Sequence, residues 1–414
     1  MEKIKTIRGV RDICYPRSSV WDKIEKICSS VLEGYAYRRI HIPVIEFTSL
    51  FSRSIGEETD IVSKEMYAFK DRKGRDIALR PEGTAGVVRA VIENNLLQGS
   101  SREKLYYSGP MFRYERPQEG RYRQFYQIGC EVFGSRQPET DAETAAAALE
   151  IARKCGAGGL DLRVNSVGCD ECRPPYRRKV ADFLAENSGE LCEDCMRRKD
   201  TNTLRVLDCK KNKCRSVFKN IPVLKESLCS PCAEYYSDYR SLLEALGCSF
   251  TEDTGLVRGL DYYTGPVFEL EADKGGVIAA GGRYDGLVKK LGGPDIPACG
   301  WAFGLERLES ASDITASRLP AVYIMLMPGG DAGLCRSAAA ALRKSGVSVE
   351  ENYEDISPGK KLKDADRKGA GWALFVGEEE TVKGFYSLKN LMTGEQRKVP
   401  GDELEKVSRE FACE

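Results

Sequence analysis

Histidine is almost absent from this sequence. Among its 414 residues the only one is His41, which lies in an extended run that includes Pro43. A Ser-His-Asp hydrolase would have to depend on this one side chain, and the strand–turn–helix motif that presents the nucleophile in many such enzymes is also missing. The sequence therefore excludes that class of enzyme, and we interpret His41 as structural.

Net charge and long apolar runs are lacking too. The 63 basic and 63 acidic side chains cancel, so a nucleic-acid partner would have to be held by local patches. No run approaches the ~20 apolar residues that span a bilayer, and residues 1–5 have none of the apolar character of a secretory signal. We therefore expect a cytoplasmic protein with no membrane partner. Sixteen cysteines are unusual there, since cytosolic thiols stay reduced.

The familiar phosphate-binding loops are missing as well, because no stretch fits the Walker pattern or a clean dinucleotide fingerprint. Three separated stretches nevertheless share arginine, glycine and tyrosine: residues 111–131, residues 255–265, and residues 281–286 with 300–307. Arginine forks match phosphate oxygens, and glycine lets the backbone approach a base or a phosphate. Any one stretch could be a glycine turn with a surface arginine. Together they predict a single polyanion site.

The stretch 111–131 is the most informative. Two extended runs flank a polar turn with Pro117 and Gly120, which predicts a strand, a loop and a returning strand. Alternation along the strands groups the polar side chains by face: Arg113 with Glu115 on the first arm, and Gln127 with Glu131 on the second. Burying such groups unpaired would be costly, so a charged, polar ligand is expected there.

The turn before a helix near Ala85 carries Glu82 and Thr84. One interpretation is a helix cap with Thr84 as the N-cap residue. The other is a pocket for an ammonium group, with Glu82 as its partner. On this segment alone the cap is favoured.

Eight cysteines between residues 169 and 232 have the spacing of metal ligands. They form three pairs separated by two residues and one wider pair: Cys169 and Cys172, Cys192 and Cys195, Cys209 and Cys214, Cys229 and Cys232. Eight thiolates could hold two four-coordinate Zn²⁺ ions in a structural role, stapling a module that is short of apolar core. The other interpretation is a set of reduced, buried cysteines, and the spacing leaves open which cysteines would share an ion.

Composition divides the chain into four segments. Residues 1–165 and 249–315 mix helical and strand patterns, and in the first of them Asp141 is expected to cap an alanine-rich helix. Residues 166–248, rich in cysteine and basic residues, are predicted to be an inserted module. In residues 320–414 strands alternate with helices, which indicates a separate α/β domain with a parallel or mixed sheet. Strands are expected at 321–327, 347–350 and 372–376, and helices at 332–345, 360–368 and 402–411.

These segments together resemble the histidyl-tRNA synthetases, a family of class II aminoacyl-tRNA synthetases, over essentially the whole chain. Residues 8–12 resemble the family's opening segment, and residues 37–43 resemble motif 1, a dimer-forming helix and strand with a characteristic proline. Phe112-Arg-Tyr-Glu115 opens motif 2 and Gly304-Leu-Glu-Arg307 closes motif 3. The most specific match is Leu256-Val-Arg-Gly-Leu-Asp-Tyr-Tyr263, which is similar to the stretch that marks the histidine enzyme within its class.

The resemblance implies an α+β catalytic domain of the class II synthetase type, an antiparallel sheet flanked by helices. An inserted, mostly helical Cys-rich module and a C-terminal α/β anticodon-binding domain complete the expected fold. The implied activity is that of a ligase: the carboxylate of L-histidine attacks the α-phosphate of ATP, bound with Mg²⁺, and diphosphate leaves. The histidyl group then passes to the 3′ end of tRNA(His). A homodimer is also implied.

Residue roles follow from the same resemblance. The phosphates of ATP are expected to be held by three catalytic arginines, with two further nucleotide-binding residues: Arg113, Arg258, Arg307, Glu115 and Arg121. Histidine is expected to be bound at its α-amino end by Glu82, Thr84 and Gln127, and around its imidazole by Glu131, Tyr262 and Tyr263. The tRNA acceptor end is expected to meet Arg116 and Gln118, and the basic helix with Lys360, Lys361, Lys363 and Arg367 could face nucleic acid.

Other functions are weaker fits. A non-catalytic paralogue, such as the regulatory subunit of ATP phosphoribosyltransferase, would usually lack the terminal domain and the stretch around Arg258, and both are present here. A tRNA-sensing regulatory module would be fused to further domains. A zinc-ribbon nucleic-acid binder would explain the cysteines but not the polar hairpin.

Overall fold

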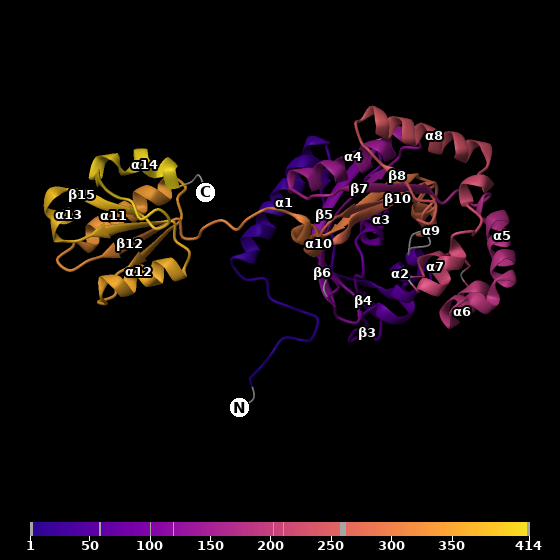
Figure 1. The fold of residues 1–414 in the computed structure, drawn as a ribbon, viewed down its shortest axis with the longest axis horizontal. Helices are drawn as coiled ribbons and strands as arrows, with labels where there is room; N and C mark the ends of the chain where they lie inside the picture. Colours follow the sequence, from indigo (N-terminus) through magenta and orange to yellow (C-terminus); the bar gives the residue numbers. More distant parts are fainter. Residues whose placement is uncertain are drawn as a thin grey trace. The chain divides into compact units, whose positions relative to one another are not determined.

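The structure is a computed structural model that describes residues 3–411 except residues 58, 100, 119, 202, 210 and 257–261. Arg258 therefore lies outside the described residues. The chain forms two compact units, residues 1–314 and residues 315–414 (Figure 1). Within the described residues, no helix is long and apolar enough to cross a membrane.

An eight-stranded sheet organises the first unit, in the order β1-β5-β6-β11-β10-β9-β7-β8. Every strand pair is antiparallel except the two at the edges, β1–β5 and β7–β8. The strands are β1 (Arg38–Arg39), β5 (Glu103–Phe112), β6 (Gln124–Phe133), β7 (Asp161–Ser166), β8 (Thr251–Glu252), β9 (Pro266–Ala272), β10 (Gly276–Arg283) and β11 (Ala298–Gly304). The predicted antiparallel sheet and the hairpin of β5 and β6 are confirmed, although the first arm starts earlier, at Glu103, and ends just before Arg113.

Helices cover both faces of this sheet, because alternate strand residues are apolar on each side. One face buries residues of β6 such as Ile128 and Cys130 against α1 (Arg17–Gly34), α4 (Pro138–Lys154), α8 (Ser230–Ala245) and α10 (Leu305–Ala311). The other face packs Tyr107 and Met111 of β5 against α3 (Thr84–Glu93) and α9 (Leu287–Lys290). Glu131 points to this second face.

The alanine-rich helix α4 begins earlier than predicted. It starts at Pro138 with Gln137 as its N-cap residue, so the expectation that Asp141 caps it is wrong. Asp141 lies inside the helix and is buried, where it pairs with Arg283 at 2.7 Å. A proline at the first helical position has its φ already set for a helix, which explains the earlier start.

A small sheet of order β2-β4-β3 adjoins the large one, formed by β2 (Ile45–Phe47), β3 (Ala68–Lys70) and β4 (Asp76–Leu79). The helix α2 (Thr48–Ile55) and the short η1 (Ile61–Glu65) complete this region. Ala78 of β4 packs against Leu50 and Phe51 of α2.

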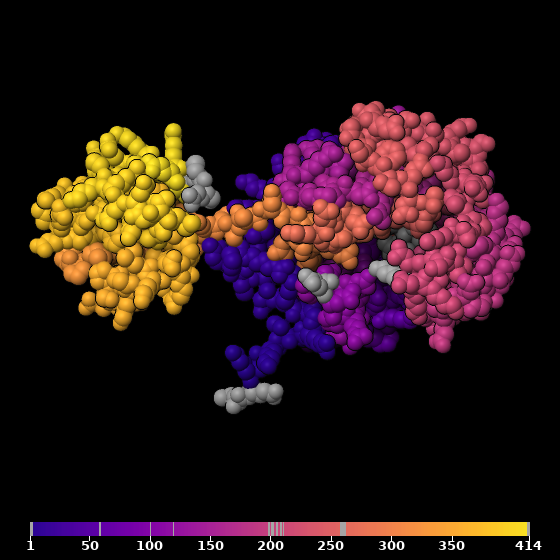
Figure 2. All heavy atoms as spheres, viewed as in Figure 1, coloured from indigo at the N-terminus to yellow at the C-terminus, as the bar shows by residue number. Residues whose placement is uncertain are grey.

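The cysteine-rich segment is mostly helical in its described residues, as expected. Its elements are α5 (Arg173–Glu186), η2 (Ser188–Glu190), α6 (Glu193–Thr201), η3 (Thr203–Asp208), α7 (Asn212–Phe218), η4 (Leu224–Ser227) and α8. Figure 1 places α5, α6 and α7 at one end of the unit, while α8 packs on α4. The segment has a small core of its own around Tyr176, Val180 and Leu184. In the space-filling view, the described residues of the cysteine-rich segment form one continuous outer surface (Figure 2).

The second unit is an α/β domain with a mixed sheet of order β13-β12-β14-β15-β16. Its strands are β12 (Val322–Leu326), β13 (Val349–Asn352), β14 (Trp372–Val376), β15 (Phe385–Asn390) and β16 (Gln396–Pro400). Its helices are α11 (Ala332–Lys344), α12 (Pro358–Arg367), α13 (Glu378–Lys383) and α14 (Leu404–Phe411), with η5 (Gly401–Glu403) before the last. The first three strands are parallel and confirm the expected α/β unit, whereas β15 and β16 form an antiparallel extension that the sequence did not predict.

Candidate active site

Glu131 forms the centre of the candidate site. Its side chain is buried on β6 and accepts hydrogen bonds from the hydroxyls of Thr84, at 2.7 Å, and of Tyr284. Burial raises the pKa of the Glu131 carboxyl to about 8, and the two hydroxyl hydrogen bonds oppose that rise. This carboxyl therefore gains or loses its proton near pH 8.

Glu82 and Thr84 lie at the start of α3, beside Glu131. The Glu82 carboxylate accepts the backbone N–H groups of Thr84 at 2.7 Å and Ala85 at 2.9 Å. Glu82, and not Thr84, therefore satisfies the helix N-terminus, which corrects the capping interpretation of Thr84. Burial raises the pKa of Glu82 even though these bonds act against it. The hydroxyl of Thr84 is left to hold Glu131.

Four tyrosines surround this pair of carboxyl groups. The rings of Tyr262, Tyr263 and Tyr284 lie 4.8–6.4 Å apart, and Tyr262 and Tyr284 are in the same apolar cluster as Tyr107. A Cβ on Gly129 would come within 2.5 Å of the Tyr107 hydroxyl. Glycine is needed there because it lets the Tyr107 ring reach the sheet backbone.

Two buried polar atoms at this site have no hydrogen-bond partner among the described residues: the Tyr107 hydroxyl and Oε1 of Gln127. Leaving such groups unpaired in a folded protein costs about 1–3 kcal/mol each. Tyr107 interacts with Glu131 and Glu82, and Gln127 lies on the same strand and the same face as Glu131, so both atoms suit a pocket for a small polar ligand.

Arg113 connects this pocket to a cluster of arginines. Its Nε donates to the carbonyl of Pro81 at 2.9 Å, which brings the guanidinium close enough to lower the pKa of Glu82 against the larger effect of burial. Another nitrogen of Arg113 is 3.8 Å from Glu115, and Arg121 is 3.4 Å from the same carboxylate. The guanidinium also lies over the Phe125 ring, 5.1 Å from its centre.

Arg307 of α10 belongs to the same cluster. Burial lowers its pKa, and the nearby guanidinium groups of Arg121 and Arg113 lower it further. Its guanidinium donates to the carbonyl of Val277 at 2.8 Å. Three guanidinium groups gather here among the carboxylates of Glu115, Glu65 and Glu269, and guanidinium forks suit the oxygens of a polyanion.

The loop between β5 and β6 carries the two residues expected to meet tRNA. Arg116 and Gln118 are both exposed. Gln118 and Arg121 exchange backbone hydrogen bonds of 3.1 and 2.9 Å, which closes the turn at Gly120. The loop thus presents side chains outward while Arg113 and Glu115 stay at the site.

One stretch of the predicted polyanion site has a different role. Arg283 of the Gly281–Gly286 segment is buried and pairs with Asp141 and Asp285 at 2.7 and 2.8 Å, so its charge is already satisfied. Tyr284 from that segment, together with Tyr107, belongs to the site, and the sequence did not identify either as a ligand residue. The glycine-flanked Arg-Tyr-Asp pattern pointed to the right segment, but only strand register decides that Tyr284 faces Glu131.

The eight cysteines gather into two groups of four: Cys169, Cys172, Cys229 and Cys232, and separately Cys192, Cys195, Cys209 and Cys214. Both groups could hold a metal ion, and both lie in the insertion rather than at the Glu131 pocket.

Comparison with known proteins agrees with this geometry. A family described as histidyl-tRNA synthetase matches residues 9–308, and an anticodon-binding domain family matches residues 322–410. A histidine–tRNA ligase from Aquifex aeolicus is 44% identical over 402 residues, 97% of this chain and 100% of the relative. One from Thermodesulfovibrio yellowstonii is 42% identical over 419 residues, all of both chains.

The fold comparison leads to the same family. The solved structure of an apo histidyl-tRNA synthetase from S. aureus superposes with a TM-score of 0.78 at 34% identity, covering 98% of this chain and 100% of that one. Similarity of this extent includes the catalytic sheet, the insertion and the C-terminal domain. With a carboxyl pocket and an arginine cluster side by side on one sheet, the chain belongs to the histidyl-tRNA synthetase family, class II ligases that join L-histidine to its tRNA.

Proposed function

We propose that this ligase binds L-histidine between α3 and β6 and ATP at the adjoining arginine cluster. The histidine pocket would be formed by Glu82, Thr84, Gln127, Glu131, Tyr262 and Tyr263, with Tyr107 and Tyr284 added from the structure. The observation that carries the proposal is the buried Glu131 carboxyl, held by Thr84 and Tyr284 on a sheet face that also carries two polar atoms without a partner in the described part of the chain.

This pocket chemistry suits an imidazole. A neutral imidazole has one N–H donor and one acceptor nitrogen, and the imidazolium has two donors. The Glu131 carboxyl can meet one nitrogen as an acceptor, or as a donor when it is protonated, and the hydroxyl of Tyr263 can meet the other. A site built on such hydrogen bonds can reject analogues that lack them by roughly 10⁴-fold or more.

The α-amino group of histidine would lie toward Glu82 and Gln127. Oε1 of Gln127 is a buried acceptor with no partner among the described residues, which an ammonium donor would satisfy. The negative charge of Glu82, close to Arg113, would place the substrate's α-carboxylate on the arginine side. This orientation directs the carboxylate toward the nucleotide.

ATP would enter as its Mg²⁺ complex, in which the ion offsets part of the phosphate charge. Arg113 would hold the α-phosphate and Arg307 the far end of the triphosphate, with Glu115 and Arg121 also at the nucleotide. The closeness of these guanidinium groups supports the assignment. By family resemblance Arg258 would balance charge at the α-phosphate.

The reaction then needs no covalent enzyme intermediate. A carboxylate oxygen of histidine attacks the α-phosphorus, the bond to the β-phosphate oxygen breaks, and diphosphate leaves. In the second step a hydroxyl of the terminal adenosine attacks the acyl carbon of the adenylate, and AMP leaves with the bonding electron pair. Catalysis comes from positioning the two substrates and from stabilising charge on phosphate.

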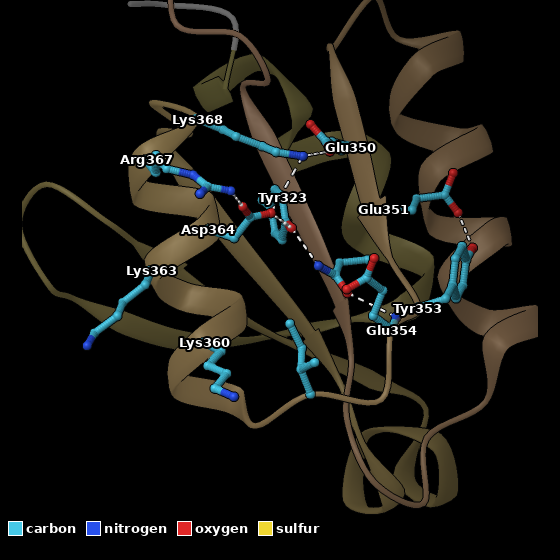
Figure 3. A pocket seen from close by; sticks show the side chains of 12 residues that line it. Tyr323, Glu350, Glu351, Tyr353, Glu354, Lys360, Lys363, Asp364, Arg367 and Lys368 are labelled. Atoms are coloured by element: carbon cyan, nitrogen blue, oxygen red, sulfur yellow. Dashed lines mark hydrogen bonds and ion pairs between the residues drawn. The ribbon is translucent and has the colours of Figure 1, made fainter.

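The tRNA would contact both units. Arg116 and Gln118 are exposed on the loop next to the arginine cluster, where the acceptor end must arrive. In the second unit, a cleft of about 930 Å³ is lined by α12 and β13 (Figure 3). Lys360 and Lys363 project from α12 and have no ion-pair partner within the described part of the chain.

Not all of the predicted basic helix is available to RNA. Lys361 is buried and donates to the backbone carbonyl of Leu326, so the prediction that it faces nucleic acid is wrong. Arg367 pairs with Asp364, one turn away on the same helix. We therefore assign anticodon contact mainly to Lys360 and Lys363.

We also propose a homodimer formed through the small sheet. Ile45, Phe47 and Phe69 are 51%, 52% and 46% exposed, and their cross-strand partners in β4 are Leu79 and Ile77. These side chains share one face, and several large apolar side chains gathered on one exposed face indicate an interaction surface. A second copy fits because motif 1, which forms the dimer in this family, ends next to β2.

A cytoplasmic location follows from the same proposal. None of the described cysteines forms a disulfide, which suits a reducing compartment, and the substrates of aminoacylation are found there.

Histidine-dependent ATP–diphosphate exchange with purified protein tests the function. Wild type should exchange only with histidine, and Arg113→Ala should lower the rate by about 10²–10³, as for the loss of an oxyanion donor. Arg336→Ala, an exposed arginine of α11, serves as the control and should leave exchange unchanged. A regulatory paralogue would show no exchange, and near-normal exchange in Arg113→Ala would overturn the assignment of that residue.

A further inference from the structure

The insertion contains two groups of four cysteines that the aminoacylation chemistry does not use. The root cluster joins Cys169 and Cys172, where the insertion begins, to Cys229 and Cys232 at the start of α8. The tip cluster joins Cys192 and Cys195 to Cys209 and Cys214. The spacing alone allowed several pairings. In the fold the pairing is nested: the first cysteine pair lies with the last, and the two middle pairs lie together.

The distances within each cluster match a single tetrahedral ion. All four Sγ atoms of each cluster lie within 4.8 Å of one another. Cys169 is 3.5 Å from Cys172 and 3.9 Å from Cys229, and Cys192 is 3.9 Å from Cys209. Zinc–thiolate bonds of about 2.3 Å in a tetrahedron place sulfurs about 3.8 Å apart.

Disulfides, iron–sulfur clusters and buried thiols all fit these cysteines less well than zinc does. Disulfides need sulfurs about 2.05 Å apart, and every described cysteine is free. A four-iron cluster places iron and sulfide between the thiolates and would hold them farther apart. Reduced cysteines acting as small apolar side chains would be buried, yet five of these eight are only partly buried.

Backbone hydrogen bonds to sulfur repeat in the two clusters. The N–H of Cys229 donates to Sγ of Cys172 at 3.2 Å, and the N–H of Cys192 donates to Sγ of Cys214 at 3.2 Å. Such bonds stabilise thiolates, the form that a metal requires. Cys172 and Cys214 are both buried, where a thiolate without a cation would be costly.

We propose that each cluster holds one structural Zn²⁺ ion, two per chain, and that the ion in the root cluster also positions the histidine pocket. The tip ion would staple helices whose shared apolar core is small. The second part of this inference rests on the proposed function.

The link to the pocket runs through Arg173, the residue after Cys172. Its guanidinium donates to the backbone carbonyl of Tyr263 and to that of Val167 at 3.3 Å. Val167 and Gly168 are in turn hydrogen-bonded to the backbone of Gly265, at 2.8 and 3.0 Å. The root of the insertion and the segment after Tyr263 therefore form one hydrogen-bonded unit.

This unit reaches Glu131 through aromatic contacts. The Tyr263 ring packs 6.4 Å from Tyr284, whose hydroxyl donates to Glu131. An ion that fixes Cys172 thus holds Arg173, and Arg173 holds the backbone from which Tyr263 extends. Arg173 acts as a positioning residue, and the tip cluster has no such connection within the described residues.

Metal analysis of the full-length protein is the first test. Protein expressed with zinc in the medium and purified under reducing conditions without chelator should contain two zinc atoms per chain. Cobalt substituted for zinc should give the thiolate charge-transfer and visible bands of tetrahedral sulfur coordination. Less than one zinc per chain, or iron in its place, would overturn the proposal whatever the enzymatic activity.

Paired variants separate the two ions. Cys229→Ser with Cys232→Ser, and separately Cys192→Ser with Cys195→Ser, should each retain one zinc, whereas the control Cys14→Ser, an exposed cysteine, should retain two. Loss of both ions in the tip variant with its circular dichroism unchanged would refute independent sites.

Diphosphate exchange measured on the same variants tests the link to the pocket. The root variant should raise KM for histidine about 10-fold, with a smaller change in KM for ATP, as expected when support of a binding residue is lost. The tip variant should leave both constants near wild type. An equal KM for histidine in the two variants would refute the positioning role of the root ion. The assignment of two zinc ions would then be judged by the metal analysis alone.

Discussion

Removing the Tyr284 hydroxyl should change the pH dependence of histidine use. Tyr284 donates to Glu131, and this bond helps to lower a pKa that burial has raised to about 8. A hydrogen bond to a charged group contributes about 1.5–3 kcal/mol, and one pKa unit corresponds to about 1.4 kcal/mol. Tyr284→Phe should therefore raise the pKa of Glu131 by about 1–2 units.

The sign follows from counting protons. Free imidazole has a pKa of about 6.5, and Glu131 is mostly protonated below pH 8, so between these values one proton is shared by substrate and site. Above pH 8 the ionised carboxylate can only accept from an imidazole N–H and must carry its charge in a buried site, and below pH 6.5 the imidazolium and the protonated carboxyl hold one proton more than a single hydrogen bond needs. The value of kcat/KM for histidine should form a bell, with an acid limb from the substrate and an alkaline limb from Glu131.

Diphosphate exchange at limiting histidine, followed from pH 5.5 to 10, measures both limbs. In Tyr284→Phe the alkaline limb should move upward until the substrate's own amino group becomes limiting, while the acid limb stays in place. Gln does not titrate, so in Glu131→Gln the alkaline limb should come only from that amino group, while the acid limb of the substrate imidazole stays in place. An alkaline limb that is the same in wild type, Tyr284→Phe and Glu131→Gln would refute the role of this carboxyl.

Two further predictions concern stability and assembly. Asp141→Asn should lower the free energy of unfolding by about 1.5–3 kcal/mol in chemical denaturation, since the buried Arg283 loses its 2.7 Å partner but keeps Asp285. Unchanged stability with weaker ATP binding would instead return Arg283 to the polyanion site. Light scattering should show wild type as a dimer of twice the 46.0 kDa chain mass and Phe47→Asp as a monomer. The control Val382→Asp, at an exposed apolar residue of α13, should remain a dimer. A monomeric wild type would refute the interface.

Much of the architecture was predictable because its signals are local. The hairpin around Pro117 and Gly120 and the strand Trp372–Val376 follow from residue patterns within a few positions of one another. The strands β15 and β16 were missed because Phe385–Asn390 and Gln396–Pro400 mix polar with apolar residues, and their strand conformation depends on pairing, of β15 with β14 and of β16 with β15.

The site shows the same division more sharply. Sequence pointed to Glu131, Arg113 and Arg307 through residue type and family resemblance. It could not separate Arg283, which neutralises Asp141, from arginines that are held at the site, because both occur in glycine-rich segments. Which carboxylate a buried arginine pairs with depends on which helix packs against its strand, as α4 packs against β10 here.

By itself, the sequence determined the family, the order of the segments and the residue types available for chemistry, since these depend on composition and spacing along the chain. The tertiary structure alone decided that Tyr284 holds Glu131, that Glu82 caps α3, and that the first cysteine pair closes on the last. The physical reason is that register and packing bring together side chains from distant segments, and no local pattern encodes those distances.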